Sequence, residues 1–285
     1  MNIINAISNL VNNPITHLIG DSKGRNRANN AGRALEEYVK DLFAGTFEIC
    51  ETDRLQKLSE VFSYLGNNSN PPDAMLRGGD AIEVKKIESE GSSLALNSSY
   101  PKHTLKVSSP MISSACIAAE TWTEKDMIYV VGVIDKHTDD LKRLCMVYGS
   151  DYCASEETYN RIKEKIKEGV EMIPDIEFSD TKELGRVNRV DPLGITYLRV
   201  RGMWGIENPW NVFSYVYDKP ENATFDFMCI INDDKWNQLE NKDELISLAL
   251  INNKLQIKDI KIKNPDNPAK LCEAKLITFE MEQQK

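Results

Sequence analysis

Apolar residues recur at helical spacing in several stretches of the chain. In the first stretch they stand at positions 3, 4, 7, 10 and 11, which places them on one helix face, and Asn12-Asn13-Pro14 ends the pattern. The same spacing places Leu35 and Leu42 on one face of a second helix. Together these patterns predict helices over residues 3–11, 30–43, 54–64, 112–122, 156–169 and 235–250.

Short apolar or alternating runs, bounded by turn residues, predict β-strands elsewhere. The continuous apolar run at residues 127–134 is typical of a buried central strand. The predicted strands cover residues 74–76, 81–87, 94–96, 127–134, 144–148, 195–200, 211–217, 225–231, 255–262 and 275–281. We therefore expect an α/β protein with a mixed β-sheet flanked by helices and with additional strands at the C-terminus.

Composition narrows the class of protein. The chain has 285 residues, of which 41% are hydrophobic and 28% are charged, as in ordinary globular proteins. No apolar run approaches the roughly 20 residues that cross a bilayer, and the N-terminus lacks the basic start and cleavage site of a signal peptide. Because no repeat or convincing linker divides the chain, we expect one cytoplasmic domain over residues 1–285 without membrane contact.

Cysteines and net charge limit the possible ligands. The six cysteines are scattered without a CxxC pair, and only three histidines are present, so neither a zinc site nor a disulfide framework is predicted. The net charge of −9 argues against a protein that coats nucleic acid indiscriminately. A local basic groove remains compatible with this charge.

One segment, NPPDAMLRGGDAIEVKK at residues 70–86, combines charged side chains with a predicted hairpin. Two short apolar strands flank Arg-Gly-Gly-Asp, a composition that suits a tight turn. The hairpin brings Asp73 beside Glu83, and the period of two along the second strand places Glu83 and Lys85 on one face. The alternative is a solvent-exposed hairpin face with an ion pair.

Two carboxylates and an ammonium group suit phosphoryl chemistry. Asp73 and Glu83 can hold Mg²⁺, a hard ion that keeps several waters and takes further ligands from a substrate phosphate. The ion acidifies a bound water and neutralises charge on the phosphate. Lys85 either positions the attacking water or stabilises the transition state, and the sequence leaves these two roles open.

The spacing of these residues resembles that of the PD-(D/E)XK nucleases, with Asp73, nine intervening residues, and then Glu-Val-Lys. The resemblance implies that Asp73 and Glu83 bind the metal and that Lys85 assists hydrolysis of a phosphodiester. It also implies an upstream helical glutamate that completes the catalytic site. Glu36 is the first choice because it lies at the edge of the apolar helix face, and Glu37, on the opposite side, is the alternative.

Longer segments resemble the NgoPII family of type II restriction endonucleases. They are GRNRANNAGRALEEYVKDLF (residues 24–43), LALNSSYPKHTL (94–105), MVYGSDYCA (146–154) and ELGRVNRVDPLGITYLRVRGMW (183–204). The resemblance weakens after about residue 210 and leaves the C-terminal quarter unassigned. It implies a restriction-endonuclease-like core, with the catalytic part at about residues 20–150 and the DNA-recognition and C-terminal elements at about 151–285.

The resemblance further implies a Mg²⁺-dependent homodimer that cuts both strands of a short palindrome in double-stranded DNA, GGCC in the named family. A two-fold protein axis matched to a two-fold DNA axis presents one active site to each strand. A cognate DNA methyltransferase is an expected functional partner. The alternatives are a repair or recombination nuclease that recognises structure or damage, and a DNA-binding protein without activity.

Basic and polar residues in three segments are candidates for DNA contact. The stretch from residue 182 to 201 holds five basic and two acidic residues. Arginine side chains can donate hydrogen bonds to the O6 and N7 acceptors of guanine. The candidates are Arg186, Arg189, Arg199, Arg201, Arg25, Arg27, Asn97, Ser98, Ser99, Tyr100 and Lys102. Surface loops and a solvated strand face are the alternatives. Aromatic residues are expected to fill the core, so none is assigned a base-stacking role.

Overall fold

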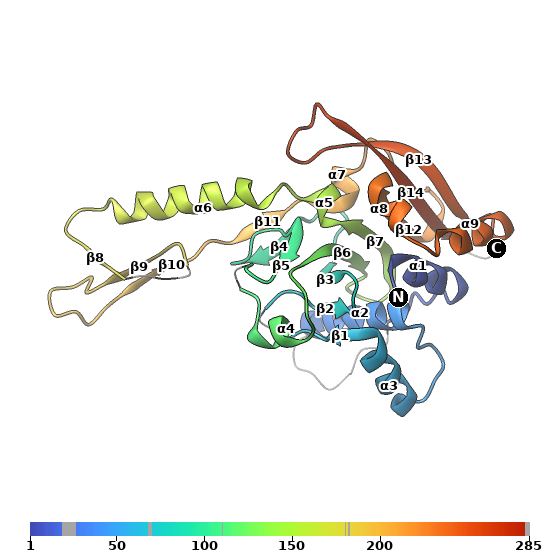
Figure 1. The fold of residues 1–285 in the computed structure, drawn as a ribbon, viewed down its shortest axis with the longest axis horizontal. Helices are drawn as coiled ribbons and strands as arrows, with labels where there is room; N and C mark the ends of the chain where they lie inside the picture. The colour runs from blue at the N-terminus through green and yellow to red at the C-terminus, as the bar shows by residue number, and fades with distance from the viewer. Residues whose placement is uncertain (19–26, 68–69, 110, 180, 182, 283–285) are drawn as a thin grey trace.

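The computed structural model describes residues 1–18, 27–67, 70–109, 111–179, 181 and 183–282 (Figure 1). A mixed sheet forms its centre, with β3 parallel to β6, β7 parallel to β12, and the other neighbouring strands antiparallel. In spatial order its strands are β1 (Phe62–Tyr64), β2 (Ala74–Leu76), β3 (Ala81–Ile87), β6 (Glu124–Ile134), β7 (Leu141–Tyr148), β12 (Ala223–Asn232), β14 (Leu271–Glu282) and β13 (Leu255–Lys263), while β5 (Thr104–Lys106) pairs with β6 off this path. The predicted mixed α/β fold is confirmed and is compatible with a restriction-endonuclease-like core.

The two sheet faces bury separate hydrophobic cores. Along β6, Ile128 and Val130 belong to one core while Met127 and Tyr129 belong to the other, as the two-residue period of a strand requires. The first core is covered by α1 (Ile3–Asn12), α2 (Arg27–Ala44), α3 (Glu51–Val61), α8 (Asp233–Gln238) and α9 (Lys242–Ile251). The second core is covered by α4 (Ser114–Ala118), α5 (Gly149–Tyr152), α7 (Pro209–Val212), β4 (Leu94–Asn97) and β11 (Trp204–Ile206).

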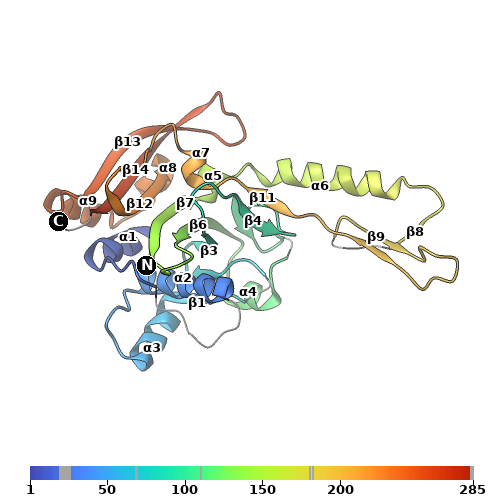
Figure 2. The same ribbon diagram turned by 180° about the vertical axis from the view of Figure 1, so that it is seen from behind.

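An arm, residues 156–203, projects from this body (Figure 1). It consists of α6 (Glu156–Glu171) and a small sheet of β8 (Glu177–Phe178), β9 (Gly185–Asn188) and β10 (Leu198–Val200) in the order β10-β9-β8. Figure 2 shows the arm from behind, again clear of the body. No residue of α6 is buried, so the arm contributes little to the protein core.

Residues 211–217 do not form the predicted strand. They contain the end of α7 and the turns that follow it. The Asn208 side chain caps this helix by accepting a hydrogen bond from the backbone N–H of Asn211 at 3.0 Å, and Pro209 occupies its first turn. Both are signals of a helix start, and they outweigh the apolar alternation.

Other predicted elements have the right type but different bounds. The helix predicted at 112–122 shortens to α4, the helix predicted at 235–250 divides into α8 and α9, and of the strand predicted at 195–200 only β10 forms. The helix predicted at 54–64 ends at Val61, because the next residues pair with β2 as strand β1. Within the described ranges, none of the helices has the length and apolar character that a membrane span requires.

Candidate active site

The hairpin of β2 and β3 positions the first two acidic residues. Its strands are antiparallel with Ala74 opposite Ile82, which confirms the predicted hairpin. Asp73 continues this ladder, because its N–H donates to the carbonyl of Ile82 at 3.0 Å. Its carboxylate accepts a hydrogen bond from the N–H of Val84 at 2.7 Å. Asp73 is thereby fixed beside the segment of β3 that carries Glu83.

Glu83 and Lys85 project from the same side of β3, as the alternation predicted, while Val84 packs in the core between them. The Lys85 ammonium donates to Oε1 of Glu83 at 2.5 Å. The second oxygen, Oε2, is buried and has no hydrogen-bond partner among the described residues. Since buried carboxylate oxygens are normally partnered, this oxygen indicates a missing ligand.

The electrostatics of the site favour a bound cation. Burial, together with the neighbouring Glu83 charge, raises the pKa of Asp73 to about 8. Burial acts to lower the pKa of Lys85, but the Glu83 and Asp73 carboxylates raise it above its ordinary value, so the amine keeps its proton. Two close carboxylates share one lysine, and only one of them accepts a hydrogen bond from it.

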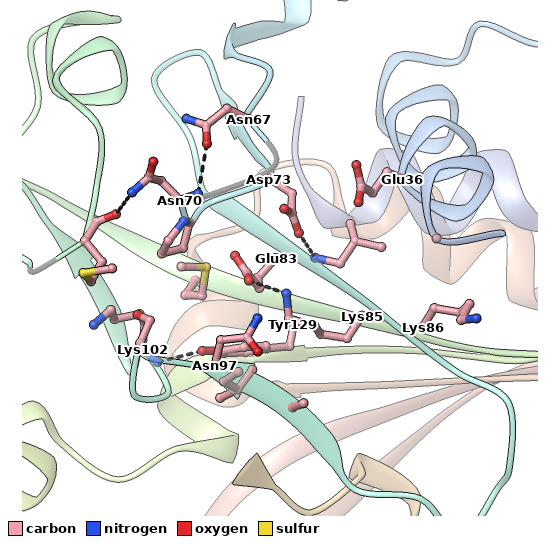
Figure 3. Close-up of a pocket in the computed structure, with 18 of the residues that line it drawn as sticks. Glu36, Asn67, Asn70, Asp73, Glu83, Lys85, Lys86, Asn97, Lys102 and Tyr129 are labelled. Atoms are coloured by element: carbon pink, nitrogen blue, oxygen red, sulfur yellow. Dashed lines mark hydrogen bonds and ion pairs between the residues drawn. The ribbon is translucent and has the colours of Figure 1, made fainter. Parts of the chain in front are cut away.

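The helix α2 contributes Glu36 to the same pocket (Figure 3). Burial raises the pKa of Glu36, an effect that Lys40 and Lys85 partly offset. Glu37 lies elsewhere, because it accepts hydrogen bonds from Lys40 and Arg54, each at 2.8 Å, and they lower its pKa against the effect of burial. The structure therefore brings the first choice, Glu36, to the site and leaves the alternative outside it.

The pocket is an open cavity of about 800 Å³ between α2, β3 and the segment after β4. Asn97, Ser98, Tyr100 and Lys102, all predicted DNA contacts, line it. Asn97 and Ser98 are exposed. The Tyr100 ring is buried and its hydroxyl donates to Glu156 at 2.7 Å, so this group is already engaged within the protein.

The four arginines of the arm that were predicted to contact DNA do not line this pocket. Arg186 and Arg199 lie on β9 and β10 of the arm, and none of the arm residues lines the cavity. Arg199 and Arg201 both bond to Glu183, with nitrogen–oxygen distances of 2.7 Å. Arg186 instead stacks over the ring of Tyr197, with its guanidinium carbon 4.9 Å from the ring centroid.

The remaining arginine predictions have different outcomes. Arg189 also lies in the arm, in a left-handed conformation with φ of 50°. Arg25 falls outside the described residues, and Arg27 begins α2, where only the backbone is described. The predictions for Arg25 and Arg27 therefore stay predictions, and the structure gives only the start of the helix at residue 27.

Tyr129 lines the pocket and was not predicted from the sequence. It stands opposite Glu83 in the parallel register of β3 and β6, and its hydroxyl accepts a hydrogen bond from the N–H of Lys102 at 2.6 Å. The general expectation that aromatic residues fill the core conceals this position. Only the strand register, which sequence periodicity does not fix, reveals it.

The donor set fits a hard divalent cation. Among the residues that the structure describes, no group of three or more His, Cys, Asp or Glu side chains forms a ready metal site. Mg²⁺ at phosphate-binding sites commonly uses one or two carboxylates and fills its other positions with water and phosphate. A cation here would partner the free oxygen of Glu83 and counteract both the burial and the Glu83 charge that raise the pKa of Asp73.

Comparison with known proteins assigns the family. The profile of the NgoPII restriction endonuclease family matches residues 1–263. The chain belongs to this family. It is 63% identical over 281 residues to the type II restriction enzyme NgoPII of Neisseria gonorrhoeae, and the match covers 99% of this chain and 100% of that enzyme. No solved structure matches the chain.

Membership of the NgoPII family makes the chain a type II restriction endonuclease, a hydrolase that cuts DNA. The family match continues well past residue 210, where the resemblance found in the sequence weakens. The C-terminal strands β12 and β13 therefore lie within the family match, in agreement with their place in the main sheet, whereas β14 lies beyond residue 263.

Proposed function

We propose that this NgoPII-family endonuclease uses Mg²⁺ to hydrolyse double-stranded DNA at a short palindrome of the GGCC type, acting as a homodimer. The observation that carries the metal dependence is the buried, unpartnered oxygen of Glu83 beside Asp73 and Lys85 in an open pocket. The arrangement of these residues supports their assignment to the PD-(D/E)XK class of nucleases. The specificity for GGCC follows from the family resemblance.

Each residue at the pocket has a distinct role in this proposal. Asp73 and Glu83 would hold the Mg²⁺, which when bound acidifies a water ligand and neutralises charge on the phosphate. Lys85 keeps its proton because of the two carboxylates and stabilises negative charge on the phosphate or orients the attacking water. Glu36, on α2, adds a third carboxyl group to the lining of the pocket.

The reaction replaces one phosphorus–oxygen bond by another. The water oxygen forms a bond to the scissile phosphorus as the bond to the 3′ oxygen breaks, and the water proton ends on the solvent or on the leaving oxygen. The products are a 5′-phosphate and a 3′-hydroxyl. Since each protomer holds one such site, a two-fold dimer on a two-fold DNA site cuts both strands.

The single domain over residues 1–285, the cytoplasmic location and a partner methyltransferase remain part of this proposal. Protection of host DNA is the reason to expect the methyltransferase. The division into a catalytic part at about residues 20–150 and recognition elements at about 151–285 is supported by the position of the pocket, whose lining residues lie between 30 and 129.

Digestion of plasmid DNA tests the proposal. With Mg²⁺ we expect discrete fragments whose sequenced ends fall at one palindrome, and with EDTA we expect no cleavage. Glu83→Gln should abolish cleavage and retain DNA binding, whereas Glu273→Gln, an exposed carboxylate on β14, should cut as the wild type does. The mass of the protein in solution, measured by light scattering, should be that of a dimer.

Other outcomes would identify the alternatives. Cleavage without a preferred sequence would indicate a nuclease that recognises structure or damage. DNA binding without cleavage under any divalent cation would indicate an inactive DNA-binding protein. Cleavage that persists in EDTA would contradict the metal dependence.

A further inference from the structure

Among the described residues, three polar side-chain atoms at the pocket are buried without a hydrogen-bond partner: Oε2 of Glu83, Oγ of Ser99 and Nζ of Lys102. The proposed metal accounts for the first atom. The other two are hydrogen-bond donors, and Figure 3 shows Lys102 across Glu83 and Lys85 from Glu36. Since buried polar groups nearly always have a partner, these donors indicate an acceptor ligand at this end of the pocket.

Lys102 is an unusual lysine, because only 4% of its surface is exposed. Its ammonium lies 3.5 Å from the centroid of the Tyr100 ring, which attracts a cation but provides no hydrogen-bond acceptor for its three donors. Burial lowers the pKa of Lys102 to about 8, an effect that the charges of Glu156 and Glu83 partly offset. An anion bound at the amine would supply the missing acceptors and favour the charged form.

Three contacts hold the segment that carries Lys102. The N–H of Lys102 donates to the Tyr129 hydroxyl, and the Tyr100 hydroxyl donates to Glu156. Gly149 lies so close that a Cβ there would be 2.3 Å from the carbonyl oxygen of Lys102. A donor fixed in this way loses little conformational freedom when it binds a ligand.

We propose that Lys102 and Ser99 bind a backbone phosphate of the cleaved DNA strand, next to the scissile phosphate. This subsite rests on the proposed function, because it presumes a DNA strand across Asp73 and Glu83. Phosphate oxygens accept from both an ammonium and a hydroxyl, and such contacts fix the register of a strand without reading its sequence. Lys102 is therefore a substrate-binding residue that places the scissile phosphate at the carboxylates.

The salt dependence of DNA binding tests the subsite. Binding of a GGCC-containing duplex oligonucleotide is measured in EDTA over a range of salt concentrations. We expect Lys102→Met to bind about tenfold or more weakly, as for loss of one charge-assisted hydrogen bond. The slope of log K against log salt should become shallower by about 0.9, the contribution of one phosphate. Lys102→Arg should keep the wild-type slope.

A matched control is Lys261→Met. Lys261 is 62% exposed on β13, which lies at the opposite edge of the sheet from β1 and β2. This variant removes the same charge and should bind DNA with the wild-type slope. Thermal unfolding establishes that each variant is folded. If Lys102→Met does not fold, Ser99→Ala takes its place in an experiment with methylphosphonate-substituted oligonucleotides.

Neutral phosphates locate the contact. In oligonucleotides that carry one methylphosphonate at a time, the wild type should lose affinity at a phosphate adjacent to the scissile one. Lys102→Met should be insensitive at that position only, and Ser99→Ala should show a reduced effect there. An unchanged salt slope in folded Lys102→Met, or wild-type sensitivity at every phosphate in both variants, would overturn the subsite.

Plasmid cleavage by the wild type in Mg²⁺ separates this inference from the proposed function. Normal cleavage combined with an unchanged slope for Lys102→Met would reject only the subsite. Absence of cleavage combined with the expected change in slope would reject only the proposed activity.

Discussion

Two buried carboxylates, Asp73 and Glu83, lie beside a single lysine that pairs with only one of them. Asp73 shows the energetic cost of this arrangement. Burial and the Glu83 charge raise its pKa to about 8. A surface ion pair, the alternative interpretation of the sequence, would not shift a carboxyl group in this direction. At the residue scale, this arrangement supports the proposal that a cation binds between the two carboxylates.

The stability of the metal-free protein should decrease as pH rises. The pKa of Asp73 is higher in the folded state, about 8, than its ordinary value of 3.8, so protonated Asp73 stabilises the fold. This contribution is fully present below about pH 4 and is lost as pH rises through about 8. We expect the melting temperature in EDTA to fall across this range, and Asp73→Asn to flatten the dependence.

Thermal unfolding at a series of pH values measures this effect. Mg²⁺ should raise the melting temperature more at pH 8 than at pH 5, because the carboxylates must be ionised to bind it. The exposed Glu273→Gln variant serves as the control and should keep the wild-type dependence. A dependence equally steep in Asp73→Asn would show that another group is responsible.

Substitution of the two helical glutamates should separate their roles. Glu36→Gln removes a carboxylate from the pocket and should lower the cleavage rate by tenfold or more, the order of one lost charged contact. Glu37→Gln breaks the bonds to Lys40 and Arg54 and should change stability by at most about 1 kcal/mol, with cleavage retained. Single-turnover cleavage and thermal unfolding measure the two effects. The opposite pattern would assign the role to Glu37.

Among the secondary-structure elements, the β2–β3 hairpin could be predicted from the sequence, but the contacts that hold Asp73 in place could not. The turn composition and the alternation of Ile82, Glu83, Val84 and Lys85 act over a few residues, so the sequence predicts them. The loop that packs against Asp73 depends on a contact outside the hairpin. Gly66 has φ of 72°, and a Cβ there would lie 2.3 Å from the carbonyl oxygen of Asp73.

Gly66→Ala should therefore displace Asp73 and abolish most cleavage. Gly78→Ala in the hairpin turn is the matched control, because Gly78 has a similar φ of 64° but an added Cβ meets nothing within 4 Å. The control bears only the backbone strain, about 1–2 kcal/mol, and should keep its activity at temperatures where it is folded. Cleavage rates and melting temperatures of both variants test this. Equal activity in both would argue against support of Asp73 by Gly66.

For the molecule as a whole, the arm is the feature that contributes least to the core, because no residue of α6 is buried. Ile162 and Ile166 of α6 are 44% and 43% exposed, and Leu193, between β9 and β10, is 80% exposed. A solvated apolar surface on a projecting segment is typical of contact with another molecule. Within the proposed function, the second protomer and the DNA duplex are the molecules available for that contact.

The arm arginines should differ in their contribution to DNA binding. Glu183 pairs with Arg199 and offsets its charge, whereas among the described residues no carboxylate pairs with Arg186. Arg186→Ala should reduce the slope of log K against log salt by about 0.9, and Arg199→Ala should reduce it by less. Filter binding over a salt range measures both slopes. Equal slopes for the wild type and Arg186→Ala would exclude a phosphate contact at that position.

The hairpin, the spacing of Asp73, Glu83 and Lys85, and the family resemblance could all be predicted from the sequence, because strand alternation and motif spacing depend on residues close together in the chain. The folded structure was needed to show that Glu36 faces the pocket, that Tyr129 borders it, and that the arm arginines lie away from it. These outcomes depend on strand register and on the packing of segments far apart in sequence, which local patterns do not encode.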